Sequence, residues 1–532
     1  MAVRVDSRRL TGASLFGDAP GAILDVRLEG EEPETVARVW NGAARRLLAA
    51  VGWEGERTSW RASGGDLSLF LTAPPDALYA ATEVNEAAWD AAGDGALEDL
   101  GRSIAEERNP ALIELRDEAA RRGVAFVADG HEVSLGMGGG HVSFPIESLP
   151  PPRDVPWERV HDVPVAMVTG TNGKSTTVRM LGAIAAAAGR CAGLSTTDGL
   201  AVGGEAIGSG DYSGPEGARR ILRDARVDVA VLETARGGIQ RRGLVVPRID
   251  AAAITNVAED HLGEFGIHGL NDIADVKMVV ARAVKPEGTV VLNADDPILK
   301  ARAAEVGAPV AWFALADAGR LLDVERIPSA FGGAARHNVA NAMAAALLAR
   351  ALGFPDSAVA SGLASFRSRR EDNPGRLNVI PLGGATVLID YAHNPHGMEA
   401  LVDVAKTLGA ARRLLVVGQA GDRDDEAIRA LVRAAFRLRP DAVVVKEMSS
   451  YLRGRAVGEI PRVITDELTR LGADPGSILH AASEVEAAEL ALAWARPGDL
   501  LVLTTHASRG EVFDLIDRLD RARWRAGSPL PS

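Results

Sequence analysis

The chain has 532 residues, of which 47% are hydrophobic, and its 59 basic and 72 acidic residues give a formal net charge of −13. This length suggests roughly three or four domains, and the negative charge argues against a general nucleic-acid-binding protein. The single cysteine, Cys191, excludes a disulfide framework, and no run approaches the roughly 18 apolar residues that span a bilayer. Because MAVRVDSRRLTGASLF also lacks the apolar stretch of a signal peptide, we expect a cytoplasmic protein without a membrane or nucleic-acid partner.

Composition along the chain predicts three regions. Residues 1–155 mix short strand-like runs with helices and end in the proline-rich SLPPPRDVPWERVHDVP, which predicts an α+β domain and a boundary. From residue 160 to 375, helices alternate with apolar strands, namely VPVAMVT, DVAVLE, AAAIT, TVVL and PVAWF. A second series, at 376–525, contains ATVLIDY, RRLLVVG, DAVVVKE and DLLVLTT. Uniformly apolar strands between helices predict parallel sheets covered on both faces, so both later domains are expected to be α/β.

The stretch VTGTNGKSTT (168–177) lies between a predicted strand and an alanine-rich helix and carries the G-K-[ST] end of a phosphate-binding loop. The standard pattern has a glycine where this chain has Val168, a β-branched residue that cannot adopt positive φ. Backbone N–H groups at a helix N-terminus would still cradle phosphates, with the Lys174 ammonium as a point charge and the Ser175 hydroxyl on a magnesium ion. The predicted nucleotide-binding loop comprises Gly170, Thr171, Asn172, Gly173, Lys174, Ser175 and Thr176.

This loop resembles that of the Mur ligase family, which carries T-G-T-N-G-K-[ST]-[ST] without the upstream glycine. Further motifs follow in that family's order, namely LETARGGIQRRGL (232–244), NVAEDHLGEFG (256–266), VLNADDP (291–297), HNVANAMAA (337–345), NPGRLNVI (373–380) and IDYAHNP (389–395). TTDG, GDYSGP, LETARGG and GDR…RGR look specifically like the Mur-ligase half of cyanophycin synthetases. The resemblance covers residues 160 to 525 and implies a P-loop central domain with a parallel sheet, followed by a Rossmann-like C-terminal domain.

The resemblance implies a reaction in which ATP phosphorylates a carboxylate and an amine attacks the acyl phosphate. Its catalytic residues map onto Lys174, Glu233, His261 and Lys277. Glu233 ends a strand beside the loop, at the sheet edge where α/β proteins bind ligands, and would hold magnesium with Ser175. His261 matches the ligand of a second magnesium, although histidine is not a ligand that magnesium favours. Lys277 matches the lysine that many Mur ligases carbamylate to hold that metal, and a solvated lysine is the alternative.

Nucleotide contacts carry over in the same way. Asn256, Asn338 and Asn341 match adenine-contacting positions, and amides suit adenine because they both donate and accept hydrogen bonds. Asn338 alternatively caps a helix. Arg376 would reach the ATP phosphates and Asp390 the ribose. Because these two residues belong to a different predicted domain from the loop, the resemblance implies that domain closure completes the site.

Substrate contacts are expected on several loops. Arg236 is followed by two glycines, so its guanidinium could grip a carboxylate, and a structural ion pair is the alternative. The other positions that match substrate-side loops are Thr197, Asp198, Asp211 and His393, with Asp422, Arg423, Arg453 and Arg455 for an incoming amino acid. Charged loop residues are otherwise simply solvated.

We therefore expect an ATP- and Mg²⁺-dependent, ADP-forming amide ligase that joins an amino acid to a small-molecule or peptide carboxylate. The resemblance to the family also implies a homo-oligomer. The alternative is a non-catalytic ATP-binding scaffold or regulatory subunit. Cyanophycin synthetases place an ATP-grasp domain between their N-terminal domain and their Mur half. Here TEVNEAAWDAA (82–92) resembles the N-terminal domain, and residues 114–140 resemble the beginning of the ATP-grasp region, as a truncated remnant of it. Only residues 141–160 then separate this remnant from the Mur-like strand. We expect one kind of amide bond and not complete cyanophycin synthesis.

Overall fold

The computed structural model describes residues 2–90, 95–260 and 263–531, and its contacts form two compact units. The first unit comprises Met1–Asp317 with Ala340–Gly362, and the second comprises Ala318–Val339 with Leu363–Ser532. The N-terminal region is therefore grouped with the middle region, and the division into three domains stays a prediction. None of the helices in the described part of the chain is long and apolar enough to cross a membrane.

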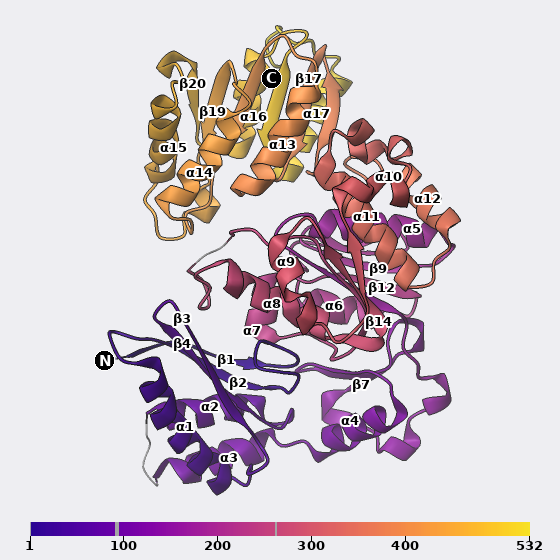
Figure 1. The fold of residues 1–532 in the computed structure, drawn as a ribbon, viewed down its shortest axis with the longest axis vertical. Coiled ribbons are helices and arrows are strands. Elements are labelled where there is room, and N and C mark those ends of the chain that lie inside the picture. The colour runs from indigo at the N-terminus through magenta and orange to yellow at the C-terminus, as the bar shows by residue number, and fades with distance from the viewer. Residues whose placement is uncertain (1, 91–94, 261–262, 532) are drawn as a thin grey trace. The chain divides into compact units, whose positions relative to one another are not determined.

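The N-terminal region contains a four-stranded antiparallel sheet in the order β1-β2-β4-β3. Helices α1, α2 and α3 cover one face of this sheet (Figure 1) and bury an apolar cluster against it. A smaller three-stranded antiparallel sheet, β5-β6-β7, follows with α4. The element bounds are β1 Val3–Leu10, β2 Gly21–Arg27, α1 Pro33–Ala50, β3 Thr58–Ser63, β4 Asp66–Thr72, α2 Leu78–Trp89, α3 Gly95–Glu107, α4 Pro110–Arg122, β5 Phe126–Ala128, β6 Glu132–Leu135 and β7 Val142–Pro145.

The middle region is built on an eight-stranded sheet in the order β11-β10-β9-β12-β8-β13-β14-β15. Its strands pair in parallel from β9 to β15, while β10 and β11 add an antiparallel edge. The element bounds are β8 Val165–Thr169, α5 Lys174–Ala187, β9 Ala192–Thr196, β10 Gly199–Val202, β11 Glu205–Ser209, α6 Pro215–Leu222, β12 Val229–Glu233, α7 Arg236–Arg242, β13 Ile249–Ile254, α8 Leu270–Arg282, β14 Val284–Asn293, α9 Pro297–Arg302, β15 Val310–Phe313, α10 Ala318–Leu321, α11 Arg336–Ala351 and α12 Asp356–Ser365.

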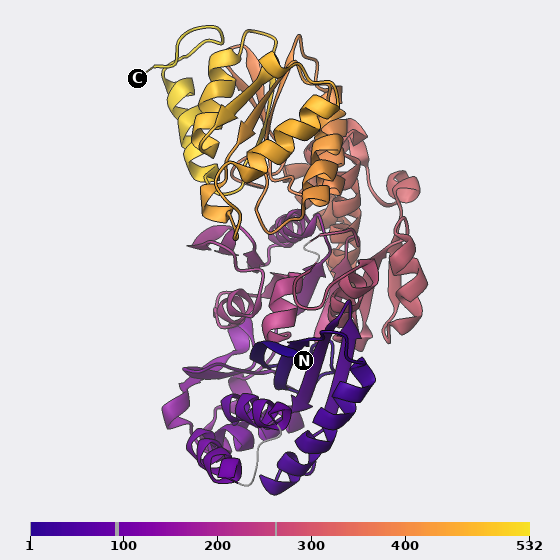
Figure 2. The same cartoon turned by 90° about the vertical axis from the view of Figure 1, so that its left-hand side faces the viewer.

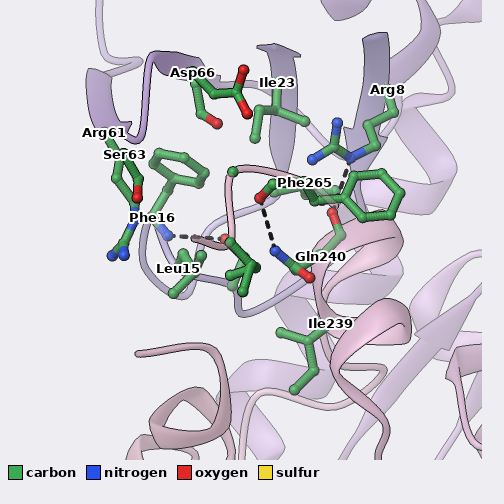
Figure 3. Close-up of a pocket in the computed structure, with 15 residues that line it drawn as sticks. Arg8, Leu15, Phe16, Ile23, Arg61, Ser63, Asp66, Ile239, Gln240 and Phe265 are labelled. Atoms are coloured by element: carbon green, nitrogen blue, oxygen red, sulfur yellow. Dashed lines mark hydrogen bonds between the residues drawn. The ribbon is translucent and has the colours of Figure 1, made fainter. Parts of the chain in front are cut away.

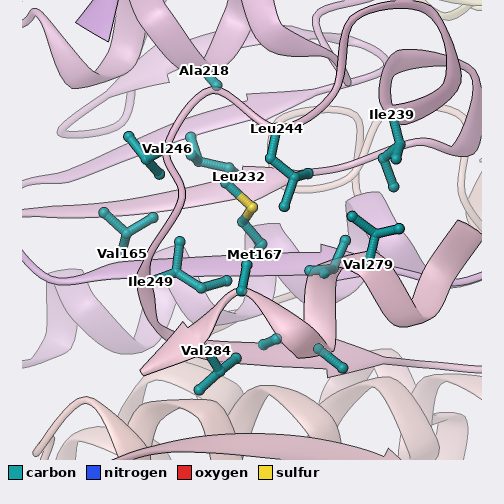
Figure 4. Close-up of a cluster of buried hydrophobic side chains, with 14 of the residues drawn as sticks. Val165, Met167, Ala218, Leu232, Ile239, Leu244, Val246, Ile249, Val279 and Val284 are labelled. Carbon is teal, nitrogen blue, oxygen red and sulfur yellow. The ribbon is translucent and has the colours of Figure 1, made fainter. Parts of the chain in front are cut away.

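Apolar side chains fix the central strands of this sheet. Met167 of β8 and Leu232 of β12 lie in one buried cluster with Ile249 of β13 and Val279 of α8 (Figure 4). Every residue of β8 and β12 is buried, as expected for parallel strands that helices cover on both faces. The continuous apolar runs seen in the sequence therefore hold β8, β12 and β13 side by side, so that their carboxyl ends meet at one edge.

The second unit contains a six-stranded sheet in the order β16-β17-β21-β18-β19-β20, parallel except for the β16–β17 hairpin. Two separate apolar clusters, one under α13, α14 and α15 and one under α16 and α17, cover its two faces (Figure 2). The element bounds are β16 Asn378–Leu382, β17 Ala385–Asp390, α13 Pro395–Thr407, β18 Arg413–Val417, α14 Asp425–Phe436, β19 Ala442–Lys446, α15 Glu459–Arg470, β20 Ile478–Ala481, α16 Glu484–Trp494, β21 Leu500–Thr504 and α17 Arg509–Arg521. Both α/β sheets predicted from the sequence are confirmed.

The N-terminal sheet packs on the middle region through the face that its own helices leave uncovered. Arg8 Nε of β1 donates to the Gln240 carbonyl oxygen of α7 at 2.9 Å, and Arg61 Nη2 of β3 donates to Asp272 Oδ1 of α8 at 2.6 Å. Between these contacts lies a small pocket bordered by side chains such as Phe16, Ile239 and Phe265 (Figure 3). The N-terminal sheet is thus anchored to α7 and α8, the helices that follow β12 and β13.

Candidate active site

The phosphate loop joins β8 to α5 and takes its two positive φ angles from glycines that the sequence provides. Gly170 has φ 145° and Gly173 has φ 88°, and a Cβ atom at either would overlap Thr255 or Asn341. Val168 is instead a strand residue that pairs with Glu233 of β12 and with β13. The upstream glycine is unnecessary because the chain at that position is still in the sheet.

The residues after β13 hold the loop in shape. Asn172 N donates to Asn256 Oδ1 and Asn256 Nδ2 donates to the Asn172 carbonyl, each at 3.0 Å. The hydroxyl of Thr255 donates to the same carbonyl at 2.6 Å, and Thr171 Oγ1 donates to the Ala258 carbonyl at 3.0 Å. The Asn256 amide is therefore engaged with the loop backbone, while its predicted contact with adenine stays a prediction. Thr255 escaped the sequence analysis, although it lies at the carboxyl end of an apolar strand.

Lys174 and Ser175 begin α5 at the end of this loop. Lys174 Nζ donates to the Thr171 carbonyl oxygen at 3.0 Å, so the ammonium lies over the loop that would receive a phosphate. Ser175 and Thr176 are buried in the first turn of α5. The N–H groups of this turn and the ammonium supply positive charge to the same place, which is the arrangement that binds a phosphate chain.

Glu233 lies next to Ser175 at the end of β12. Ser175 Oγ donates to Glu233 Oε2 at 2.7 Å, and Thr197 donates to both carboxylate oxygens, from its N–H at 3.1 Å and its hydroxyl at 2.7 Å. The Glu233 side chain is almost completely buried, with 2% exposure. Within the described residues, no lysine or arginine forms an ion pair with it. A buried carboxylate held only by neutral donors is costly, and a bound cation would balance it.

Lys277 of α8 is a buried amine near two other cations. Its side chain is 3% exposed, and burial, with the charges of Lys174 and Arg236, holds its pKa well below the usual value, although the Asp260 charge opposes this shift. The neutral amine is therefore favoured more strongly than it would be in a solvated lysine. His261, the predicted neighbour of Lys277 in the metal site, lies outside the described residues.

The predicted substrate residues of the first unit form ion pairs and hydrogen bonds with other residues of that unit. Arg236 begins α7 and its Nη2 donates to Glu264 Oε2 at 3.0 Å, so the ion pair considered as an alternative exists. Asp198 lies 3.6 Å from Arg179 Nη2, an arginine that the sequence analysis did not select. Asp211 Oδ1 accepts hydrogen bonds from the N–H and hydroxyl of Ser213 and so shapes the turn before α6.

In the second unit, two predicted site residues, Arg376 and His393, pack against the same aromatic ring, that of Tyr391. The Arg376 guanidinium lies 4.7 Å from the Tyr391 ring centroid, and His393 and His506 pack edge-on against the same ring at 5.3 and 5.0 Å. Asp390 accepts N–H groups from Leu377 and Ala392 at 2.8 Å each. Burial raises the pKa of Asp390, while these donors and Arg376 oppose the rise. Asn338 Nδ2 donates to the Ser329 carbonyl at 2.9 Å.

The loops predicted to bind the incoming amino acid are held by hydrogen bonds and ion pairs to neighbouring residues of the same unit. Arg455 donates to Asp425 Oδ1 at 2.6 Å and to the Arg423 carbonyl at 2.5 Å, and Asp422 lies 3.9 Å from Arg423. The Arg453 guanidinium stacks over the Tyr451 ring, 5.6 Å from its centroid. Their substrate roles stay predictions.

A buried polar cluster in the same unit escaped the sequence analysis. Lys446 Nζ contacts the Glu484 carboxylate and donates to the Thr504 carbonyl at 2.6 Å, and Glu484 accepts the backbone N–H of His506 at 2.7 Å. Burial and the Lys446 charge lower the pKa of His506 to about 4, against the pull of Glu484. The sequence signal that could have indicated this cluster is Lys446, a lysine at the end of an otherwise apolar strand.

Two family models match this chain in sequence order. The Mur ligase middle domain matches residues 168–349, and the Mur ligase glutamate ligase domain matches residues 375–506, together more than half of the chain. The chain belongs to the Mur ligase family. The first match begins at the strand residue Val168 and includes the phosphate loop, Glu233 and Lys277, so the cluster described above lies within the Mur ligase middle domain.

Named relatives give the same assignment. A cyanophycin synthetase of Nostoc sp. is 37% identical over 349 residues, which are 60% of this chain and 38% of that protein. The UDP-N-acetylmuramoyl-L-alanyl-D-glutamate--2,6-diaminopimelate ligase of Geobacillus thermodenitrificans is 26% identical over 408 residues, covering 70% of this chain and 79% of the relative. The chain thus spans about two fifths of the length of its cyanophycin synthetase relatives.

A solved structure shows the same fold. E. coli FolC, in complex with ADP and without folate substrate, superimposes with a TM-score of 0.50 at 22% identity over 68% of this chain and 90% of its own. This chain thus has a fold that is already known from a solved structure. The likeness at this identity concerns the fold alone.

Magnesium, which the family implies, fits the first of its two predicted sites. Magnesium is usually held by one or two carboxylates together with substrate phosphates and water, and Ser175 and Glu233 supply a hydroxyl and an uncompensated carboxylate beside the phosphate loop. Lys277 as an amine is a poor ligand for a hard cation. It fits a second site only after conversion to an anion, as a carbamate.

Proposed function

We propose that this chain is an ATP-dependent, ADP-forming amide ligase that activates a carboxylate as an acyl phosphate and joins it to the amine of an amino acid. The observation that carries the proposal is the meeting of Lys174, Ser175 and Glu233 at one loop, where cationic groups and a buried, uncompensated carboxylate lie together. Phosphoryl transfer depends chiefly on positioning and charge stabilisation, and these groups supply both.

The first step forms a bond between a carboxylate oxygen of the substrate and the γ-phosphorus of ATP, and breaks the bond to the β–γ bridging oxygen. The leaving ADP keeps that electron pair, and Lys174 with the N–H groups of α5 stabilises the charge on the phosphates. Magnesium, when held by Ser175 and Glu233, would neutralise phosphate charge. Asn256 and Thr255 keep the loop in its binding shape before ATP arrives.

In the second step the amine nitrogen attacks the acyl carbon, inorganic phosphate leaves and the nitrogen loses a proton. Arg236 and the loops around Thr197 and Asp211 are proposed to hold the carboxylate substrate. Loops of the second unit, with His393 and Arg423, are proposed to hold the amine. The products are one amide, ADP and inorganic phosphate.

Lys277 is proposed to act as a carbamate. A neutral lysine amine adds to CO₂, forming an N–C bond and releasing one proton. Burial and the charges of Lys174 and Arg236 favour the neutral amine, and the same two positive charges favour the anionic product. The carbamate oxygens would give a second magnesium, with His261, the anionic ligand that the amine cannot provide.

The test is release of inorganic phosphate from ATP in the presence of pooled amino acids and pooled di- and tripeptides. We expect release that requires Mg²⁺, a carboxylate and an amine together, and that falls more than 100-fold in Lys174→Ala, because one charge contact in a dry site is worth about 3 kcal/mol. Lys277→Met should fall comparably. Lys300→Ala, an exposed lysine of α9, is the matched control.

Two outcomes would reject the proposal. AMP and pyrophosphate in place of ADP and phosphate would rule out an acyl-phosphate mechanism. ATP binding that saturates without any combination of carboxylate and amine stimulating turnover would favour a scaffold or regulatory subunit.

A further inference from the structure

Three arginines from different elements gather where the end of β1 meets α6 and α7. Thr11, just beyond β1, donates its N–H and hydroxyl to the Arg242 carbonyl at 2.7 and 3.0 Å, and its hydroxyl oxygen contacts Arg219 Nη2 of α6 at 3.5 Å. Arg9 lies two residues earlier, on the same face of the strand, with its guanidinium 3.5 Å from the Tyr79 ring centroid. Thr11 thus brings the backbone of one arginine and the side chain of another together beside Arg9.

These arginines differ from their neighbours in having no carboxylate. Arg8 pairs with Asp6 and Asp25, and Arg223 pairs with Asp129. Across residues 2–90, 95–260 and 263–531, by contrast, no aspartate or glutamate forms an ion pair with Arg9, Arg219 or Arg242. In a chain with a net charge of −13, unpaired cations that gather at one place are unexpected.

Two further observations indicate that an acceptor belongs among them. Arg219 is half-buried, and its Nε is buried without a hydrogen-bond partner, although buried guanidinium N–H groups are normally satisfied. Burial and the charges of neighbouring arginines lower the pKa of both Arg219 and Arg242. The nearest carboxylates that oppose these shifts, Asp129 and Asp6, are already bonded to Arg223 and Arg8.

We propose that Arg9, Arg219 and Arg242 form a binding site for a multiply charged oxyanion, a polycarboxylate or a phosphate. Guanidinium groups present paired N–H donors that match both kinds of oxyanion, and three of them favour a ligand with more than one negative charge. The Tyr79 ring stacks on one face of the Arg9 guanidinium. A ligand would therefore bind along the N–H edge of this guanidinium.

This site is separate from the phosphate loop but close to the predicted substrate loops. Arg242 ends the seven-residue helix α7, which begins at Arg236, so the two arginines are about 10 Å apart along the axis. Arg219 lies in α6, which begins at Pro215, shortly after Asp211. Anion binding here does not depend on the proposed ligase activity, so it can be tested without turnover.

The experiment measures binding of inorganic phosphate, pyrophosphate, citrate and tri-aspartate by calorimetry. It uses the full chain carrying Lys174→Ala, so that the phosphate loop contributes little. On that background, one variant combines Arg9→Gln, Arg219→Gln and Arg242→Gln. The matched control combines Arg4→Gln, Arg226→Gln and Arg248→Gln, which removes the same charge from three exposed arginines that each pair with a carboxylate.

We expect at least one probe to bind the Lys174→Ala protein, and the site variant to lose at least tenfold in affinity while the control changes less than twofold. The bound probe should also raise Tm in the control but not in the site variant, because a ligand stabilises only the state that binds it. Preference for the phosphates or for citrate and tri-aspartate would identify the ligand class. Equal losses in both variants, or no binding of any probe, would overturn the proposal.

Discussion

At the scale of single residues, Glu233 combines burial with a charge that no described lysine or arginine balances. Burying this carboxylate without a cation costs folding free energy, and the same carboxylate would attract magnesium. The lack of a paired lysine or arginine among the described residues explains both the folding cost of Glu233 and its proposed role as a metal ligand. A cationic side chain paired with Glu233 would lower that cost but would compete with magnesium for the carboxylate.

Glu233→Gln tests this link because it keeps the shape and removes the charge. We expect ATP turnover to fall roughly 100- to 1,000-fold, as for loss of one charge-stabilising group, while Tm without ligand stays the same or rises. Calorimetry should also show that Mg²⁺ with ATP raises Tm in the unmodified protein by more than in the variant. Glu287→Gln, the same change at an exposed glutamate of β14, is the matched control. A strongly lowered Tm in Glu233→Gln would mean that the carboxylate is needed for folding.

At the scale of elements, the β3–β4 hairpin forms hydrogen bonds with the first turn of α8, the helix that carries Lys277. Arg61 Nη2 and Ser63 Oγ donate to the Asp272 carboxylate at 2.6 and 3.0 Å, and Asp272 also accepts the N–H groups of His268 and Gly269. Asp272 therefore caps α8 with one set of bonds and joins the N-terminal sheet with another. The first turn of this helix depends on a distant part of the chain.

Arg61→Ala should accordingly loosen α8 without touching the phosphate loop. We expect a loss of about 1–2 kcal/mol in stability, because hydrogen bonds to partly exposed carboxylates disappear, and faster hydrogen exchange in residues 270–282. Arg27→Ala removes a pair with Asp66 inside the N-terminal sheet and should leave exchange in α8 unchanged. The same exchange rate for α8 in both variants would refute the dependence.

How far the sequence predicts this fold differs among the elements. The strands of the two α/β sheets and the phosphate loop follow from apolar runs and from GTNGKST, since these signals are local. The hydrogen bond from Arg61 to Asp272 joins residues 211 positions apart, so no local sequence pattern predicts it. Asn256 is expected near adenine because it matches a family position, and in the structure its amide also bonds the Asn172 backbone. The family position did not reveal this loop contact, and the contact with adenine stays a prediction.

At the scale of the whole molecule, the connection between the N-terminal region and β8 limits what the chain is expected to make. Residues 141–164 hold β7 and three short 3-10 turns, which leave no room for another nucleotide-binding domain at that place. Incubation with ATP, Mg²⁺, aspartate, arginine and a short primer should therefore give at most one kind of amide bond. Mass spectrometry of the products tests this expectation, and growth of an alternating aspartate–arginine polymer would contradict it.

The path of the chain between the two units has a consequence for limited proteolysis. The chain crosses between them at residues 317–318, 339–340 and 362–363, and the last two crossings lie inside the helices α11 and α12. The crossing at 317–318 lies between the 3-10 helix Leu315–Asp317 and the four-residue helix α10. Because single helical turns open more readily than longer helices, we expect a nick near Asp317 before one at the crossings inside α11 and α12. Such a nick leaves two intact covalent links, and the fragments would stay together under native conditions and separate only on a denaturing gel.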